Sequence, residues 1–152
     1  IDRREFADIL SVSEDGGKTW ERRSIIAHDG YHRFCEGAIV ILHGGKRLAC
    51  VLRENHSAGI PSFVTFSDDC GHTWSETQRC PFALHRPYAK QLADGRVLVT
   101  GRHVNGGLGC YGWVGDLEAE ELEERQRHRA VAVRLDRAGQ NAGIIHVPDS
   151  AL

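Results

Sequence analysis

One glutamate and three arginines lie at related positions along this chain, and together they could bind an anion. Arg53 follows Glu36 at nearly the same distance along the sequence as Arg102 follows Arg86. A guanidinium group is planar, keeps its charge at every relevant pH and can form two parallel hydrogen bonds with a carboxylate. The four residues therefore predict a binding site for a carboxylated ligand, if the fold brings them together.

Each of these residues also has an ordinary interpretation. Arginines at the ends of strands are often simply exposed, and Glu36 could do no more than hydrogen-bond a neighbouring loop. Residue type alone does not separate the two interpretations. The decision depends on the elements that position the four side chains.

A repeated pattern shows how those elements are organised. SEDGGKTW (13–20) and SDDCGHTW (67–74) share the pattern Ser-x-Asp-x-Gly-x-Thr-Trp, and we call them the first box and the second box. ILHGGKRLACVLREN (41–55) is likewise echoed by QLADGRVLVTGRHVN (91–105). Both features give a period of about 50 residues, which is typical of propellers and other repeat arrays.

One period contains four segments with the patterns of β-strands. Glycines separate the first two segments, as in a β-hairpin, and the second box turns the chain between the last two. Four antiparallel strands repeated at this spacing describe one blade of a β-propeller. The four segments are GAIVIL (37–42), KRLACVLR (46–53), IPSFVTF (60–66) and SETQRC (75–80).

The whole chain, residues 1–152, is predicted to be one all-β unit, a partial β-propeller of about two and a half four-stranded antiparallel blades. Closed propellers typically have 4–8 blades, so we expect a fragment whose missing blades would leave strand edges and apolar faces unpaired. The charged stretch 116–130 is expected to be a short helix or an insertion, because its acidic start and basic end match a helix dipole. Residues 1–30 are predicted to be the end of one blade, with strands at 3–13 and 21–27. Residues 31–82 are predicted to be a complete blade. Residues 83–152 are predicted to be the next blade with an irregular insertion, and they contain strand-like segments at 130–136 and 143–148.

The order of strands within a blade places the candidate residues at one end of the propeller. The chain reverses direction at each turn, so the start of the first strand and the end of the second lie on the same rim. Glu36, just before the first strand, and Arg53 occupy these places in the middle blade, and Arg86 and Arg102 occupy them in the next. The two boxes fall on the opposite rim.

The boxes are interpreted as structural turns rather than as catalytic sites. An aspartate can fold its carboxylate onto N–H groups of its own turn, a glycine allows a positive φ, and a tryptophan supplies apolar surface for packing. Neither box contains a nucleophile with a base beside it. The residues of the two boxes are Ser13, Asp15, Gly17, Thr19 and Trp20, and Ser67, Asp69, Gly71, Thr73 and Trp74.

With two matches to this pattern at blade spacing, the chain resembles the sialidases (neuraminidases) and other proteins of the Asp-box, or BNR repeat, superfamily. The resemblance covers roughly residues 3–115. It implies a six-bladed sialidase-like propeller in which the boxes lie away from the active site. It also implies a parent protein that is an exo-α-sialidase-type glycoside hydrolase, which hydrolyses terminal carboxylated sugars.

The resemblance further implies roles for individual residues. In sialidases, arginines bind the sugar carboxylate, a tyrosine is the nucleophile, a glutamate is its base and an aspartate is the acid/base catalyst. This mechanism differs from that of most glycosidases, which use two carboxylates. Glu36 matches the catalytic base, and Arg53 matches a substrate-binding arginine. Arg102 and Arg86 are further substrate-binding candidates.

No complete catalytic set can be assembled from the chain. In the family, the first arginine and the acid/base aspartate belong to early blades, and the nucleophilic tyrosine belongs to a later one. Tyr88 and Tyr111 are expected to be packing residues. The isolated 152-residue chain is therefore expected to have no appreciable glycosidase activity.

Two other functions would use the same rim differently. A non-catalytic Asp-box propeller could bind a glycan or a protein there, since a fold does not fix a function. A purely structural interaction segment would have no affinity for saccharides. The expected partners are a carbohydrate, such as a sialylated glycan, and the missing blades of the parent chain.

The composition argues against several other classes of protein. The net charge of −2, without a basic stripe, argues against binding of nucleic acid, and no apolar run approaches the roughly 20 residues of a membrane helix. Five cysteines at irregular spacing predict neither a disulfide framework nor a zinc site, and no metal or cofactor is expected. The resemblance favours a secreted or extracytoplasmic protein, although the cysteines do not decide the compartment.

Overall fold

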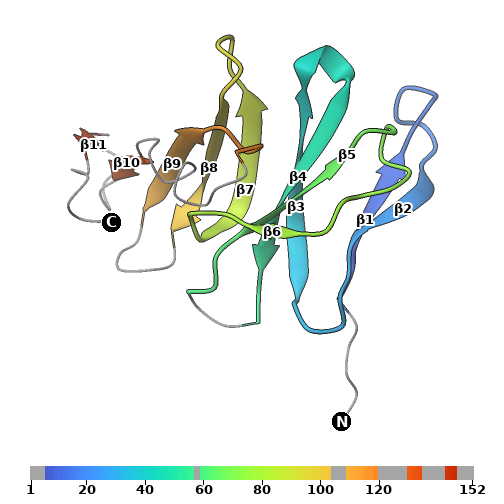
Figure 1. Cartoon of the computed structure of the whole chain (residues 1–152), viewed down its shortest axis with the longest axis horizontal. Helices are drawn as coiled ribbons and strands as arrows, with labels where there is room; N and C mark the ends of the chain where they lie inside the picture. Colours follow the sequence, from blue (N-terminus) through green and yellow to red (C-terminus); the bar gives the residue numbers. More distant parts are fainter. Residues whose placement is uncertain (1–5, 57–58, 104–108, 120–129, 135–142, 147–152) are drawn as a thin grey trace.

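The computed structural model describes residues 6–56, 59–103, 109–119, 130–134 and 143–146. Within these residues the chain is all-β, and its strands form three antiparallel sheets that stand side by side (Figure 1). The described sheets do not close into a barrel. The prediction of an all-β protein built from successive antiparallel sheets is therefore confirmed.

The first sheet is a hairpin whose two strands are joined by the first box: β1 (Asp8–Val12) and β2 (Glu21–Ala27). The second sheet runs in chain order and contains β3 (Phe34–Leu42), β4 (Arg47–Glu54), β5 (Phe63–Ser67) and β6 (Gln78–Arg79), with the short 3-10 element η1 (His43–Gly45) between β3 and β4. Strand β6 is shorter than the predicted strand at 75–80. The Ser75 hydroxyl accepts a hydrogen bond from the Phe66 N–H, which replaces regular strand pairing there.

The third sheet has five strands, where four were expected: β7 (Leu84–Gln91), β8 (Val97–His103), β9 (Cys110–Gly115), β10 (Ala130–Arg134) and β11 (Gly143–His146). Both strand-like segments predicted at the C-terminal end join this sheet, and β11 pairs with what would otherwise be the exposed edge of β10. Of the charged stretch 116–130, which was expected to be a short helix or an insertion, residues 116–119 contain a turn. Residues 120–129 lie outside the described residues.

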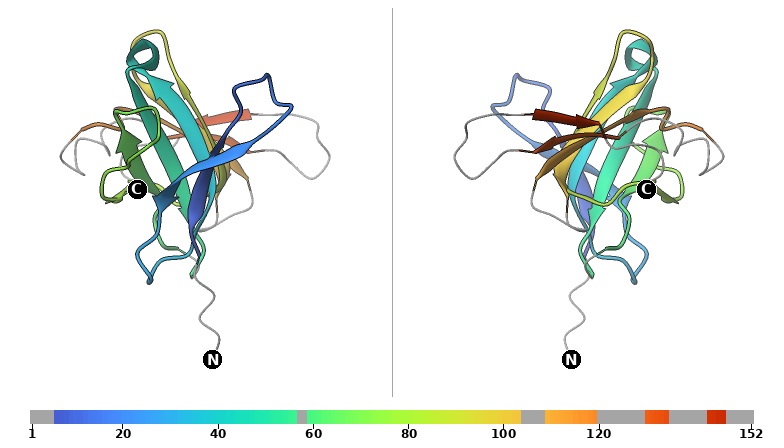
Figure 2. Two further views of the ribbon diagram at one scale, coloured as in Figure 1. Left: turned by 90° about the vertical axis from the view of Figure 1, so that its right-hand side faces the viewer. Right: turned by 90° about the vertical axis from the view of Figure 1, so that its left-hand side faces the viewer.

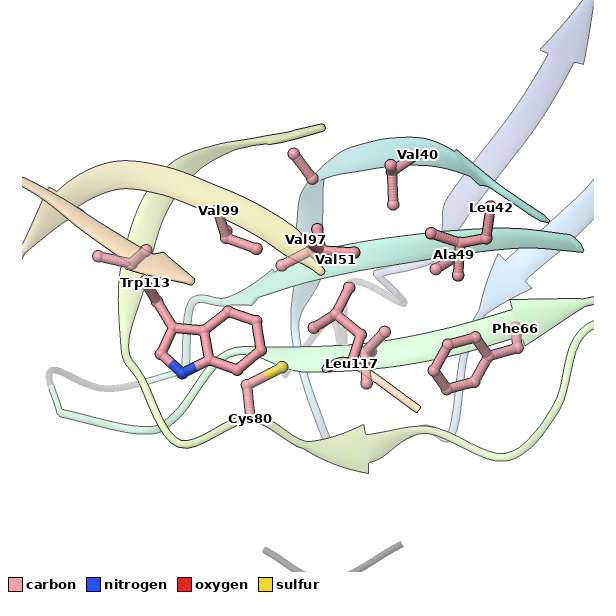
Figure 3. Packing of buried hydrophobic residues seen from close by; sticks show 13 residues of the cluster. Val40, Leu42, Ala49, Val51, Phe66, Cys80, Val97, Val99, Trp113 and Leu117 are labelled. Atoms are coloured by element: carbon pink, nitrogen blue, oxygen red, sulfur yellow. The ribbon is translucent and has the colours of Figure 1, made fainter. Parts of the chain in front are cut away.

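The hydrophobic core lies between the sheets. One cluster packs the second sheet against the third and includes Val51 together with Val97, Val99 and Trp113 (Figure 3). A second cluster packs the first sheet against the second and includes Leu10 and Phe34. Figure 2 shows the first hairpin lying against the second sheet when the molecule is viewed from that end. Packing of sheet faces against one another is how neighbouring propeller blades are held.

The two boxes fold into turns with the same hydrogen bonds. In the first box, Asp15 Oδ1 accepts from the Ser13 hydroxyl at 2.8 Å and from the Thr19 N–H at 2.9 Å. In the second, Asp69 Oδ1 accepts the equivalent bonds from Ser67 and Thr73 at 2.8 and 2.9 Å. The threonine hydroxyl donates to the other carboxylate oxygen in both boxes. Each aspartate therefore organises its own turn.

Replacing Asp69 with Asn should lower stability at neutral pH by an amount that shrinks in acid. The hydroxyl and N–H of Thr73 and the hydroxyl of Ser67 hold the pKa of Asp69 far below its usual value near 3.8. A carboxyl with a depressed folded-state pKa stabilises the fold above its unfolded pKa, and this contribution is lost as the pH falls through the folded pKa. The urea midpoints of the wild type and Asp69→Asn should therefore converge as the pH falls below about 4. A constant gap between pH 7 and pH 2 would contradict this role.

Candidate functional site

The Glu36 carboxylate connects the second sheet to the third. Arg53 Nη1 donates to Glu36 Oε1 at 2.9 Å, and the backbone N–H of Arg86 donates to Oε2 at 2.8 Å. The Arg86 Nε atom lies 3.8 Å from Oε1. Three of the four candidate residues are thus brought together by direct contacts.

The cluster lies at the end of the second sheet that is remote from the second box. Cys35 pairs with Arg53 at one end of the β3–β4 ladder, whereas Leu48 pairs with Ser67, the first residue of the box, at the other end of β4. The site therefore occupies the rim that strand order predicts. We call this end of the sheets the site rim.

Glu36 and Arg86 lie inside their strands, at β-bulges, and not before them as the sequence pattern indicated for Glu36. The registers of β3 with β4 and of β7 with β8 shift at these residues, so both stand outside the ladders. Their φ angles are 53° and 50°, in the left-handed region that non-glycine residues rarely adopt. A bulge turns a side chain away from the pleat, and backbone strain of this kind is typical of functional sites.

Arg53 is largely committed to protein partners. Its side chain is only 15% exposed, and Nη2 donates to Asn55 Oδ1 at 2.5 Å while Nη1 holds Glu36. Its Nε atom is buried and has no hydrogen-bond partner within the described residues. Arg53 is therefore better placed to orient Glu36 than to reach a ligand in solvent.

Arg86 and Arg102 present the more accessible guanidinium groups. The Arg86 side chain is 84% exposed, and Arg102, also exposed, contacts His85 Nδ1 through Nη2 at 2.9 Å. Burial and the nearby Arg53 and Arg102 charges lower the pKa of His85, against the opposing effect of Glu36. A neutral imidazole can accept the Arg102 hydrogen bond at Nδ1.

The charge balance of the rim favours an anionic ligand. Burial opposes ionisation of Glu36, but the Arg86 N–H and the Arg53 guanidinium outweigh it, so the pKa of Glu36 lies below its usual value. The guanidinium groups of Arg53 and Arg86 lie beside Glu36, and Arg102 lies on the neighbouring strand. A second carboxylate of the rim, Glu54, is buried and hydrogen-bonded to backbone N–H groups. The surplus positive charge suits a carboxylate, which an arginine can bind with two parallel hydrogen bonds.

Sequence reasoning missed two residues of the site rim. His85 is the cross-strand partner of Arg102, just as Cys35 is the partner of Arg53, so the repeat itself was the signal that could have found it. Glu54, only 3% exposed, accepts hydrogen bonds from the backbone N–H groups of Arg33 and His56 and so joins two rim loops. A buried glutamate cannot be told from an exposed one at the end of a strand without the structure.

The two tyrosines considered as packing residues behave differently. Tyr111 is partly buried and packs against the core cluster between the second and third sheets. Tyr88 does not pack in the same way, because it is 63% exposed on β7. Strand β7 alternates between inward and outward positions, and Tyr88 falls on the outward ones.

The described residues contain neither a metal-binding cluster nor a membrane-spanning helix. They include no group of three or more His, Cys, Asp or Glu side chains placed to hold a metal ion. No helix among them is long and apolar enough to cross a membrane.

Comparison with known proteins gives a structural relative without an assigned function. No protein-family model matches the chain, and no curated protein matches it. The chain is similar to a solved protein of unknown function from Dyadobacter fermentans DSM 18053, with 24% identity and a TM-score of 0.70. The similarity covers 83% of this chain and 33% of the other, so this chain spans about a third of that protein's length. At this identity the likeness concerns the fold alone.

Proposed function

We propose that this chain forms part of the sugar-binding mouth of a sialidase-like propeller glycoside hydrolase that acts on terminal carboxylated sugars. The observation that carries the proposal is the Glu36 carboxylate held between Arg53 and Arg86 on the site rim, remote from the second box. The repeated boxes and the antiparallel sheets support the assignment to this class of propeller. Further blades would complete the mouth.

Each residue of the rim has a distinct role in this proposal. The exposed guanidinium of Arg86, with that of Arg102, binds the ligand carboxylate. Arg53 orients Glu36 and keeps it ionised. An ionised carboxylate of this kind can serve as the base toward a nucleophile supplied by another blade.

One observation favours a second candidate function, a non-catalytic propeller that binds a carboxylated glycan. Both oxygens of Glu36 already accept hydrogen bonds from protein donors. A base must be free to take a proton from its nucleophile, and these bonds would have to be exchanged first. Binding through Arg86 and Arg102 needs no such exchange.

Arg86→Gln should weaken binding of N-acetylneuraminate to the chain about fivefold to tenfold. A hydrogen bond to a charged group contributes about 1.5–3 kcal/mol, and the high exposure of Arg86 reduces this toward about 1 kcal/mol. The dissociation constant can be measured from chemical-shift changes in NMR spectra. Arg96→Gln is the matched control, because Arg96 is half exposed and pairs with Asp94 in the β7–β8 turn, away from the site rim. Equal binding of the sugar methyl ester, which lacks the charge, would contradict the proposal.

The chain alone should not hydrolyse a fluorogenic sialoside, because no nucleophile with its base is assembled within the described residues. Release of the fluorophore by the purified chain can be followed by fluorescence, with Glu36→Ala as the control for contaminating enzymes. Clear turnover that Glu36→Ala abolishes would show that the chain already holds a working catalytic set. Turnover unchanged in Glu36→Ala would come from a contaminant.

A further inference from the structure

Two equivalent arginines of the site rim are held by different partners. Arg53 in β4 and Arg102 in β8 occupy matching places in their ladders with β3 and β7. Arg53 donates to the carboxylate of Glu36, which stands at the bulge of β3. The residue at the bulge of β7 is Arg86. In the third sheet this place therefore holds a second cation rather than a carboxylate.

Arg102 is held by an imidazole ring instead. Its Nη2 atom lies 2.9 Å from Nδ1 of His85, the residue opposite it on β7. Within the described residues, Arg102 forms no ion pair with a carboxylate. A guanidinium has donors and no acceptor, so this contact requires Nδ1 of His85 to be unprotonated and to accept the hydrogen bond. The ring therefore orients Arg102 without neutralising its charge.

The backbone brings these two side chains within reach of each other. Gly101, which precedes Arg102, lies so close to β7 that a β-carbon on it would be 2.9 Å from the His85 carbonyl oxygen and 3.0 Å from Leu84 Cβ. A side chain at position 101 would push the two strands apart. The close approach of β8 to β7 thus sets the distance between the imidazole and the guanidinium.

The surroundings of His85 favour the neutral ring that this hydrogen bond needs. Burial and the charges of Arg53 and Arg102 lower the pKa of His85, and the charge of Glu36 opposes them. A protonated ring would lose its acceptor and would repel Arg102. The protonation state of His85 and the geometry of its contact therefore agree.

An arginine that is oriented in advance binds an anion more tightly than a mobile one. Its side chain has several rotatable bonds, and ordering them during binding costs free energy. A carboxylate partner would order the arginine but would also compete with an anionic ligand for its donors. A neutral partner does not compete through charge, and the side chain of Arg102 is exposed, so its full charge faces solvent.

We propose that His85 is a positioning residue of the candidate site, whose neutral imidazole holds the Arg102 guanidinium ready for an anionic ligand. The relevance of this positioning to a sugar carboxylate rests on the proposed function. The positioning itself is a property of the free protein and can be tested without a ligand.

The first test is the tautomer of His85, read from the chemical shifts of its ring nitrogens in NMR spectra of the wild type at neutral pH. We expect the neutral ring with its proton on Nε2 and none on Nδ1. A histidine with no role toward Arg102 could carry the proton on either nitrogen. A proton on Nδ1, in a neutral or a charged ring, would overturn the proposal, because that nitrogen could not accept from Arg102.

The second test is the mobility of the Arg102 guanidinium in His85→Ala. Its NMR signals should be separate in the wild type, where the hydrogen bond slows rotation of the group, and should merge in His85→Ala. The signals of Arg96, which pairs with Asp94 in the β7–β8 turn, should stay the same. Unchanged Arg102 signals in a folded His85→Ala would overturn the positioning. The tautomer test needs no variant and so decides the question if His85→Ala does not fold.

His85→Asn is the matched control. The oxygen of the asparagine side chain occupies nearly the place of Nδ1 and can accept the same hydrogen bond. The separate signals of Arg102 should therefore return in this variant. Loss of the imidazole ring alone would affect His85→Asn and His85→Ala equally, and that result would overturn the positioning.

Binding of N-acetylneuraminate, measured in parallel, separates this proposal from the proposed function. The dissociation constant should rise about threefold in His85→Ala and return toward the wild-type value in His85→Asn. Merged Arg102 signals in His85→Ala, without sugar binding by the wild type, would support the positioning and reject the ligand. Sugar binding by the wild type, with Arg102 signals unchanged in His85→Ala, would support the ligand and overturn the positioning.

Discussion

Gly71→Ala should destabilise the protein by about 3 kcal/mol, whereas Gly17→Ala, at the same position of the first box, should cost only about 1 kcal/mol. Both glycines have positive φ angles, 82° and 89°, so the backbone strain of an alanine is similar at the two sites. The surroundings differ. A β-carbon on Gly71 would lie 2.3 Å from Leu10 Cδ2, whereas one on Gly17 would meet only Trp20 at 3.9 Å. The extra cost at Gly71 is therefore overpacking against the first sheet.

Urea unfolding followed by tryptophan fluorescence would measure both losses on the same chain. Leu10→Ala provides the control, because removing the leucine side chain makes room for the new methyl group. Gly71→Ala should then cost less in the Leu10→Ala background than in the wild type, which a double-mutant cycle detects. Equal losses for Gly71→Ala and Gly17→Ala would show that the second box does not pack on the first sheet.

The strands could be predicted from the sequence because their patterns are local. Alternating or continuous apolar runs, such as those that became β3 and β4, need no knowledge of distant residues. The repeat then placed Glu36, Arg53 and Arg86 near one another, because strand direction follows from strand order alone. The spacing of residues along the sequence was therefore enough to predict that these three residues lie near one another.

The remainder of the fold depends on contacts that spacing does not determine. The boxes share a sequence pattern, yet Trp20 is 64% exposed whereas Trp74 packs on the first sheet and donates from Nε1 to Ser24 Oγ. The first sheet packs against the second box, whereas no sheet among the described residues packs against the first box. The fifth strand, β11, is likewise an edge pairing that the period of the repeat does not require.

The same limit explains what was missed in the site. Bulges arise from a mismatch between two strands, so neither strand alone shows that Glu36 lies within β3. Asp8 of the first sheet lies against Gly37, the residue after Glu36, across a sheet interface. Such residues have no local pattern. They can be found only once the sheets are placed against one another.

Glu54→Ala should destabilise the protein by about 3 kcal/mol and also weaken ligand binding. Glu54 is buried beside Arg53, and its carboxylate accepts the backbone N–H groups of Arg33 at 3.0 Å and His56 at 2.9 Å. Alanine would leave both groups without their acceptor and open a cavity, and each unsatisfied buried group costs about 1–3 kcal/mol. Two such groups would together cost about 2–6 kcal/mol, and the partial exposure of the two loops keeps the total near the lower part of that range.

Glu54→Gln is the matched control, because its amide oxygen can still accept a hydrogen bond, and it should cost about 1 kcal/mol. The link to binding runs through Asn55, which follows Glu54, accepts from Arg53 and donates its N–H to the Arg33 carbonyl. When the loops separate, Arg53 loses Asn55 and holds Glu36 less firmly. Urea unfolding and sugar titration of the two variants would show whether stability and affinity fall together. Glu54→Ala could instead lose stability and still bind the sugar as tightly as the wild type. This result would show that the rim loops do not contribute to binding, because the arginines would then be held by the sheets alone.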